Sequence, residues 1–160
     1  MSIEVYDNFL PTEVFNPIKE FVFGGVMPWY YMDNSVKKGD GCPQFSHGLY
    51  GNSEPRSEVY DIVKPIFATL NPFAIHRVKF NATSRTTEIK EKPLHVDITG
   101  PSDSPEPPFE NIPDYHICVI YFNDNNGYTY FEDGQKVVSK ENRAVMFSGD
   151  LLHAGTSCTD

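Results

Sequence analysis

The chain has 160 residues, of which 39% are hydrophobic and 14% aromatic, so it can enclose one core, and we expect a single domain over residues 1–160. Thirteen Lys and Arg against 22 Asp and Glu give a formal charge of -9, which argues against nucleic acid or an acidic membrane surface as a partner. No apolar run approaches the roughly 18 residues of a membrane span. The first residues carry Glu4 and Asp7 where a signal peptide would be basic. We therefore expect a soluble, cytoplasmic protein.

Two helices are predicted in the first half of the chain. Apolar residues recur at helical spacing over Val14–Val22, and Gly24-Gly25 mark the end of that helix. A second helix is predicted over Val59–Leu70, closed by Asn71-Pro72. Pro65 lacks the N–H that would continue the hydrogen-bond ladder, so we expect a kink or an early end there.

Short strands and turns dominate the rest of the sequence, which predicts a mainly β sandwich or barrel with flanking helices. Asn123–Gly127 and Glu132–Gln135 are rich in turn residues and predict hairpins. Gly100–Pro113 contains five prolines and is expected to form a loop over one end of the sheets. The predicted strands are Trp29–Tyr31, Gln44–Tyr50, Ile75–Asn81, Leu94–Ile98, Tyr115–Phe122, Tyr128–Phe131, Lys136–Val138, Ala144–Phe147 and His153–Thr156.

Cysteine usage limits the kinds of metal site that the chain can build. Cys42, Cys118 and Cys158 lie far apart and form no C-x-x-C pair, so neither a disulfide framework nor a structural zinc site is indicated. A metal ion would have to bind through His and carboxylate side chains.

His95 and Asp97 are the first candidates for such ligands. Residues i and i+2 of a strand point to the same side, so their two side chains can converge on one ion. The alternative is a surface His beside a solvated Asp. His153 supplies a second imidazole in an apolar setting, where a hydrogen-bonded structural His is the alternative. Two His and one Asp make the facial triad of non-haem Fe(II), and the separation of 153 − 97 = 56 residues lets the chain go round a barrel and return.

A series of further segments follows a family pattern in the family's order along most of the chain. These segments are Pro28–Tyr31, Phe45–Tyr50, Arg77–Asn81, His95–Asp97, Tyr121–Asn123, Asn126–Glu132, Glu141–Arg143, Phe147 and His153–Thr156. Together they resemble the Fe(II)/2-oxoglutarate-dependent oxygenases of the prolyl-hydroxylase-like group, in particular the small members found in phages and marine microbes. For a phage protein, the expected location is the host cytoplasm.

The resemblance implies a double-stranded β-helix, or jelly roll, with iron held by His95, Asp97 and His153. It implies Fe(II) and 2-oxoglutarate as cofactors, O2 as a reactant, and ascorbate as a reductant. Tyr121 matches a tyrosine that meets the far carboxylate of 2-oxoglutarate, although a core aromatic is an equal alternative. Thr129 and Phe131 would line the same cavity, and Asn81 is assigned to the co-substrate site with them. The implied reaction hydroxylates a C–H bond of a peptidyl, prolyl or small-molecule substrate and releases succinate.

One part of the family pattern is missing. Relatives bind the far carboxylate through an Arg or Lys about ten residues past the second His, whereas Asp160 is only 160 − 153 = 7 residues past His153. We therefore expect a chain that lacks most of its last strand, and a 160-residue form that binds 2-oxoglutarate weakly or is poorly soluble. The internal substitutes are Arg143, Lys79 and Arg85. The missing residue also supports an alternative, a non-catalytic jelly-roll module that binds metal or a phage partner.

The remaining histidines, His47, His76 and His116, are not needed by the family pattern, and we expect structural or exposed roles for them. The aromatic cluster Trp29–Tyr31 could form a lid or a substrate platform, but core packing is the commoner use of such a cluster.

Overall fold

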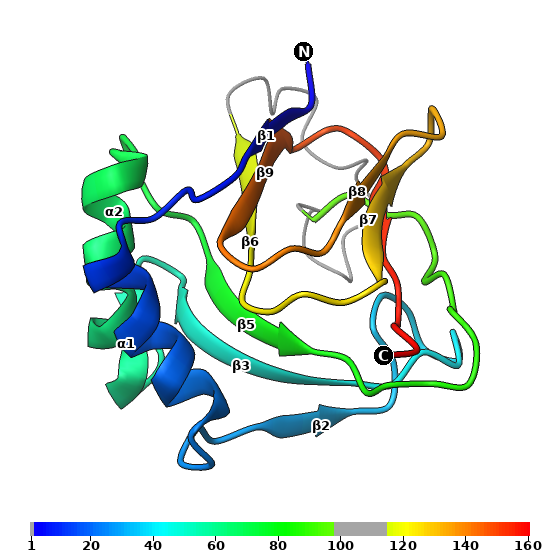
Figure 1. Ribbon diagram of the computed structural model, residues 1–160, viewed down its shortest axis with the longest axis horizontal. Coiled ribbons are helices and arrows are strands. Elements are labelled where there is room, and N and C mark those ends of the chain that lie inside the picture. The colour runs from blue at the N-terminus through cyan, green and yellow to red at the C-terminus, as the bar shows by residue number, and fades with distance from the viewer. Residues whose placement is uncertain (1, 98–114) are drawn as a thin grey trace. The chain divides into compact units, whose positions relative to one another are not determined.

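The structure of the chain is a computed structural model that describes residues 2–97 and 115–160 (Figure 1). The described residues contain ten strands in three antiparallel sheets, two α-helices and one 3-10 helix. The prediction of a mainly β protein with few helices is confirmed, and the arrangement is compatible with a β-sandwich. No helix within the described ranges is long and apolar enough to cross a membrane. The predicted loop Gly100–Pro113 lies outside the described residues.

The described chain forms two compact units, which are treated separately. The C-terminal unit consists of Met1–Phe9 with Arg85–Asp160, and the N-terminal unit of Leu10–Ser84. The single domain and the jelly-roll topology stay predictions.

The N-terminal unit is built on one long strand, which pairs antiparallel with three others. Its elements are α1 (Thr12–Phe23), β2 (Tyr30–Met32), β3 (Gln44–Gly51), β4 (Glu54–Pro55), η1 (Glu58–Val63), α2 (Lys64–Leu70) and β5 (Val78–Ala82). The long strand is β3, and its partners are β2, β4 and β5. The two strands predicted before the second helix therefore exist, although β2 begins one residue later than expected.

The helices of this unit end where the sequence predicts, for steric reasons. Helix α1 ends at Phe23 with Gly24 as its C-cap, in a turn so close that a Cβ at Gly24 would lie 2.6 Å from the Glu20 carbonyl oxygen. The second predicted helix is split in two, as Pro65 suggested: the 3-10 helix η1 ends at Val63, and α2 begins beside the proline. The Ser57 hydroxyl caps η1 by accepting a hydrogen bond from the Val59 N–H.

The C-terminal unit contains two three-stranded antiparallel sheets with apolar side chains from both in one core. Its strands are β1 (Glu4–Tyr6), β6 (His116–Tyr121), β7 (Tyr128–Phe131), β8 (Lys136–Val138), β9 (Arg143–Ser148) and β10 (His153–Gly155). One sheet has the order β1-β9-β6 and the other β10-β7-β8 (Figure 1). Phe131 and Val137 from the second sheet pack with Val145 and Phe147 from the first. Phe131 and Phe147 of this core both contact the ring of His153, which is carried by β10.

Two local expectations in this unit are corrected, and one strand was missed. Asn123–Gly127 is not a hairpin, because it joins β6 in one sheet to β7 in the other. Residues 94–97 of the predicted strand Leu94–Ile98 form only an isolated bridge at His95, because Pro93 has no N–H to continue the ladder. Strand β1 was not predicted, and all three of its residues are exposed. The Glu132–Gln135 hairpin is confirmed, with Gly134 at a positive φ of 86°.

Candidate metal centre

The main chain brings the two predicted imidazole ligands face to face. The His95 N–H donates to the His153 carbonyl oxygen and the His153 N–H donates to that of His95, both at 3.0 Å. This reciprocal pair is the hydrogen-bonded geometry of antiparallel neighbours, so both side chains leave the backbone on the same side. The ring centroids lie 4.9 Å apart. The juxtaposition therefore depends on a tertiary pairing between segments that are 58 residues apart (153 − 95).

Each imidazole is oriented by a carbonyl two residues before it. Nδ1 of His95 lies 3.1 Å from the Pro93 oxygen, and Nδ1 of His153 lies 2.9 Å from the Leu151 oxygen. A carbonyl oxygen only accepts, so Nδ1 carries the proton in the neutral ring and the lone pair is on Nε2. Metal-binding histidines are held in this way by hydrogen bonds to their second nitrogen.

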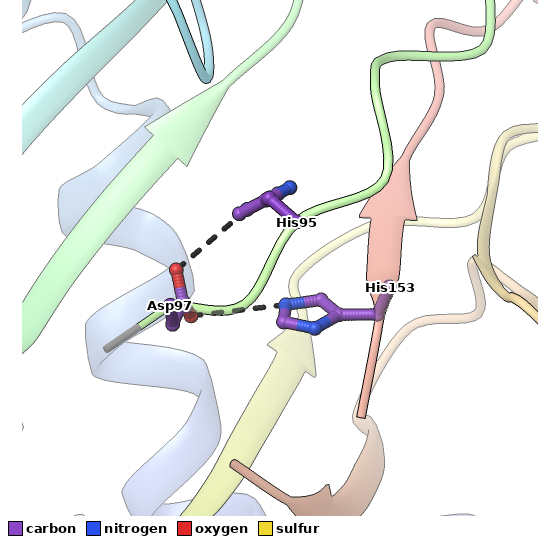
Figure 2. Close-up of side chains that lie close together, drawn as sticks. All are labelled: His95, Asp97 and His153. Carbon is purple, nitrogen blue, oxygen red and sulfur yellow. Dashed lines mark ion pairs between the residues drawn. The ribbon is translucent and has the colours of Figure 1, made fainter. Parts of the chain in front are cut away.

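Asp97 faces both Nε2 atoms and completes the group (Figure 2). Its two carboxylate oxygens lie 3.7 Å from Nε2 of His95 and 3.8 Å from Nε2 of His153. One ligand atom from each of the three residues falls within 4.8 Å of the others. The side chains are 26%, 17% and 7% exposed for His95, Asp97 and His153, so the group is sheltered but open to solvent on one side.

The donor set and its dimensions suit one metal ion. Adjacent ligands of an octahedral ion, with bonds of about 2.1 Å, lie about 3 Å apart. The two Nε2–carboxylate distances would close by less than about 1 Å to meet such an ion, a movement within the reach of side-chain torsions. His95, Asp97 and His153 thus lie close enough to bind a metal.

The floor of the site is aromatic. The His153 ring lies edge-on to Phe147, with centroids 4.6 Å apart, and Phe147 in turn contacts Phe131 at 4.9 Å. Both phenylalanines are buried in the core. One side of the imidazole therefore faces hydrocarbon, and its nitrogen ligand atom is directed away from the core toward Asp97.

The residues predicted to hold a co-substrate fall into two groups. Tyr121, Thr129 and Phe131 all contribute to the inner face of the C-terminal unit, and the Tyr121 hydroxyl donates to Thr129 Oγ1 at 2.7 Å. The register pairs Phe131 directly with His153 and Thr129 with Gly155. Asn81, by contrast, is exposed on β5, which belongs to the N-terminal unit.

The electrostatic environment of Tyr121 keeps its hydroxyl protonated. Burial raises the pKa of Tyr121, and this effect outweighs the opposing hydrogen bond to Thr129 and the charge of Arg143. The hydroxyl therefore remains a hydrogen-bond donor at neutral pH.

Arg143, Lys79 and Arg85 are the basic residues that the sequence offers as anchors for 2-oxoglutarate. Arg143 pairs across the sheet with Tyr121, but its guanidinium donates to the Asp7 carboxylate at 2.6 and 3.1 Å and to the Val138 carbonyl at 3.0 Å. Lys79 is exposed on β5 and Arg85 is exposed at the start of the C-terminal unit's long segment. Arg143 is therefore engaged by Asp7 and Val138.

The other histidines have structural or exposed roles, as expected, but the aromatic cluster is only partly in the core. His47 is buried, with Nδ1 at 2.6 Å from the Pro28 oxygen and Nε2 at 2.6 Å from Ser57 Oγ. His76 and His116 are exposed. Trp29 is half-buried against Phe80, whereas the neighbouring tyrosines of Trp29–Tyr31 are exposed rather than in the core.

Sequence reasoning missed the groups that orient the ligands. The carbonyls of Pro93 and Leu151 could have been found from their common position two residues before each His. The edge contact from Phe147 has no local signal, because it depends on the packing of β9 beneath β10. Comparisons with protein-family models, with curated proteins and with solved structures find no match to the chain.

Proposed function

We propose that this protein is an Fe(II)- and 2-oxoglutarate-dependent dioxygenase that hydroxylates a C–H bond of a peptidyl substrate, prolyl residues included, or of a small molecule. The observation that carries the proposal is the convergence of one ligand atom from each of His95, Asp97 and His153 within 4.8 Å. Two histidines and one carboxylate with open positions form the donor set typical of non-haem Fe(II) oxygenases.

The charge of the donor set suits this chemistry. Two neutral imidazoles and one carboxylate leave a divalent ion with one net positive charge, which favours a chelating 2-oxo acid. When bound together, Fe(II), 2-oxoglutarate and O2 supply oxidative decarboxylation: one oxygen atom enters succinate, which forms with CO2, and the other enters the substrate C–H bond as a hydroxyl group.

The protein's own residues have separate tasks in this proposal. The carbonyls of Pro93 and Leu151 hold the two imidazoles with Nε2 toward the ion. Phe147 excludes water from one side of His153. The hydroxyl of Tyr121 donates to Thr129 Oγ1 in the structure and would turn from that bond to donate to a carboxylate.

The experiment is anaerobic addition of Fe(II) and 2-oxoglutarate to the purified chain, followed by O2. We expect a weak visible charge-transfer band before O2 is admitted and succinate afterwards. Asp97→Ala and His153→Ala should abolish both results. His116→Ala is the matched control, because it removes an exposed imidazole that is not part of the triad. If the unaltered chain gives no band and no succinate, the proposal is refuted.

A second candidate is a metal-binding module without oxygenase chemistry. The observation that favours it is the engagement of Arg143, the basic residue opposite Tyr121, by Asp7. On this alternative the chain binds a divalent ion through the triad, but added 2-oxoglutarate produces no band and no succinate. The same titration therefore separates the two functions.

A further inference from the structure

The segment that carries His95 and Asp97 lies along β10 without being a regular strand. From Lys92 onward, its backbone bonds to β10 are Lys92 N–H to the Gly155 oxygen at 3.2 Å and the reciprocal pair of His95 with His153. Between these two points stands Pro93, which has no N–H to donate. The stretch that leads directly into the first ligand therefore cannot be held by a continuous ladder.

A tyrosine hydroxyl from β7 supplies a bond at this point. The Tyr130 hydroxyl donates to the Lys92 carbonyl oxygen at 2.5 Å. Thr129 and Phe131 are buried on the inner face of β7, so Tyr130 projects from the opposite face. The register places it beside Ala154 of β10, whose small side chain leaves room for the tyrosine to reach across that strand to Lys92.

The Lys92 carbonyl is linked to the His95 imidazole by rigid geometry. It belongs to the planar peptide group that contains the Pro93 nitrogen, and the pyrrolidine ring fixes φ of Pro93. The Pro93 carbonyl that follows is the group that orients His95 Nδ1 at 3.1 Å. Only one soft torsion, ψ of Pro93, separates the carbonyl that Tyr130 holds from the carbonyl that holds the imidazole.

We propose that Tyr130 is a positioning residue for the metal centre, because its hydroxyl fixes the Lys92-Pro93 peptide group that orients His95. This inference rests on the metal site of the proposed function but not on its oxygenase chemistry. Tyr130 touches neither the ion nor any substrate in this scheme, and it acts only through the main chain before His95.

Tyr128 provides a matched control from the same strand. Its hydroxyl donates to the Glu91 carboxylate at 2.8 Å, and Lys136 bridges the same two groups at 2.9 and 3.2 Å. These bonds connect exposed side chains and do not hold the backbone before His95. Tyr128→Phe removes a hydroxyl group of the same kind two residues from Tyr130. It leaves the bond from Tyr130 to the Lys92-Pro93 peptide group in place.

The test is a titration with Co(II), whose visible bands report the geometry of its ligands. Tyr130→Phe should weaken Co(II) binding about tenfold. This is the smallest loss of affinity that is typical when a group that orients a metal ligand is removed. It should also change the band intensities and speed hydrogen exchange at the His95 amide. Tyr128→Phe should leave the affinity, the bands and that amide as they are in the unaltered chain.

The possible results separate this inference from the proposed function. Equal Co(II) affinity and bands in Tyr130→Phe and the unaltered chain overturn the positioning role but not the metal site. Equal losses in Tyr128→Phe and Tyr130→Phe also overturn it, because a general loss of stability would then be the cause. An unaltered, folded chain that binds no Co(II) overturns the proposed function and this inference with it.

Discussion

The ring of Phe147 lies edge-on beneath the imidazole of His153, with centroids 4.6 Å apart and planes inclined by 61°. Phe147 is 1% exposed and belongs to the core of the C-terminal unit. The same side chain therefore supports both the packing of the two sheets and the position of a metal ligand.

Replacing Phe147 should affect stability and metal binding together. We expect Phe147→Ala to lower the free energy of unfolding by about 3–5 kcal/mol, because it leaves a cavity in the core. Phe147→Leu should cost less and keep the fold, yet weaken metal binding, since His153 loses its aromatic neighbour. Denaturant unfolding and Co(II) titration measure the two effects. Phe23→Leu, at an exposed position on α1, is the control and should change neither.

Metal should stabilise the protein only through the triad. At a free-ion concentration of 100 times Kd, binding to the native state adds about 2.7 kcal/mol to the free energy of unfolding. His153→Ala should eliminate this gain, whatever its effect on the metal-free protein, whereas His116→Ala should retain it. Thermal unfolding with and without Co(II) gives the comparison. A full gain in His153→Ala would show that the ion binds elsewhere.

Tyr121→Phe should separate co-substrate binding from metal binding. A hydrogen bond to a charged group contributes about 1.5–3 kcal/mol, so losing the hydroxyl should weaken 2-oxoglutarate binding at least about tenfold. Co(II) affinity should stay unchanged, because Tyr121 is not a ligand. Calorimetry on the metal-loaded protein measures both constants. Thr129→Val, which removes the acceptor of the Tyr121 hydroxyl, should have a smaller effect; unchanged 2-oxoglutarate affinity in Tyr121→Phe would exclude the assigned role.

The ion pair between Asp7 and Arg143 should make stability dependent on pH. Hydrogen bonds from Arg143, and next from Lys140, hold the pKa of the Asp7 carboxyl well below its usual range. A pKa lower in the folded than in the unfolded chain stabilises the protein above the unfolded value of about 3.9. This contribution is lost as the pH falls through the folded pKa.

Asp7→Asn should therefore be less stable than the unaltered chain at pH 7, and the difference should shrink steadily below about pH 4. Salt should also reduce it, because the pair is exposed to solvent. Urea unfolding at several pH values tests this. Asp150→Asn removes an exposed carboxylate of the same kind and serves as the reference; an identical pH profile in the two variants would contradict the assignment.

Gly24 should tolerate no side chain. Its Cβ would meet the Glu20 carbonyl oxygen at 2.6 Å, so Gly24→Ala should lower the free energy of unfolding by more than about 1 kcal/mol. Gly48→Ala is the matched comparison, because nothing lies within 4 Å of its Cβ position and its φ is not positive. Equal stabilities of the two variants would mean that the end of α1 adjusts without strain.

The sequence by itself determined the features that depend on neighbours along the chain. The apolar spacing before Gly24, the break at Pro65 and the Asp133-Gly134 turn all act within a few residues, so their outcomes follow from backbone sterics. The types of metal ligand could also be identified from the sequence, because two imidazoles and a carboxylate are a recognisable donor set wherever they lie.

Only the tertiary structure decided which distant segments meet. The segment around His95 is an irregular neighbour of β10 instead of the predicted strand, and Asn123–Gly127 connects two sheets instead of closing a hairpin. The contacts of Phe147 with His153 and of Tyr130 with Lys92 cross between strands. Strand pairing is set by the burial of whole faces and by register, which are properties of the assembled sheets rather than of any one segment.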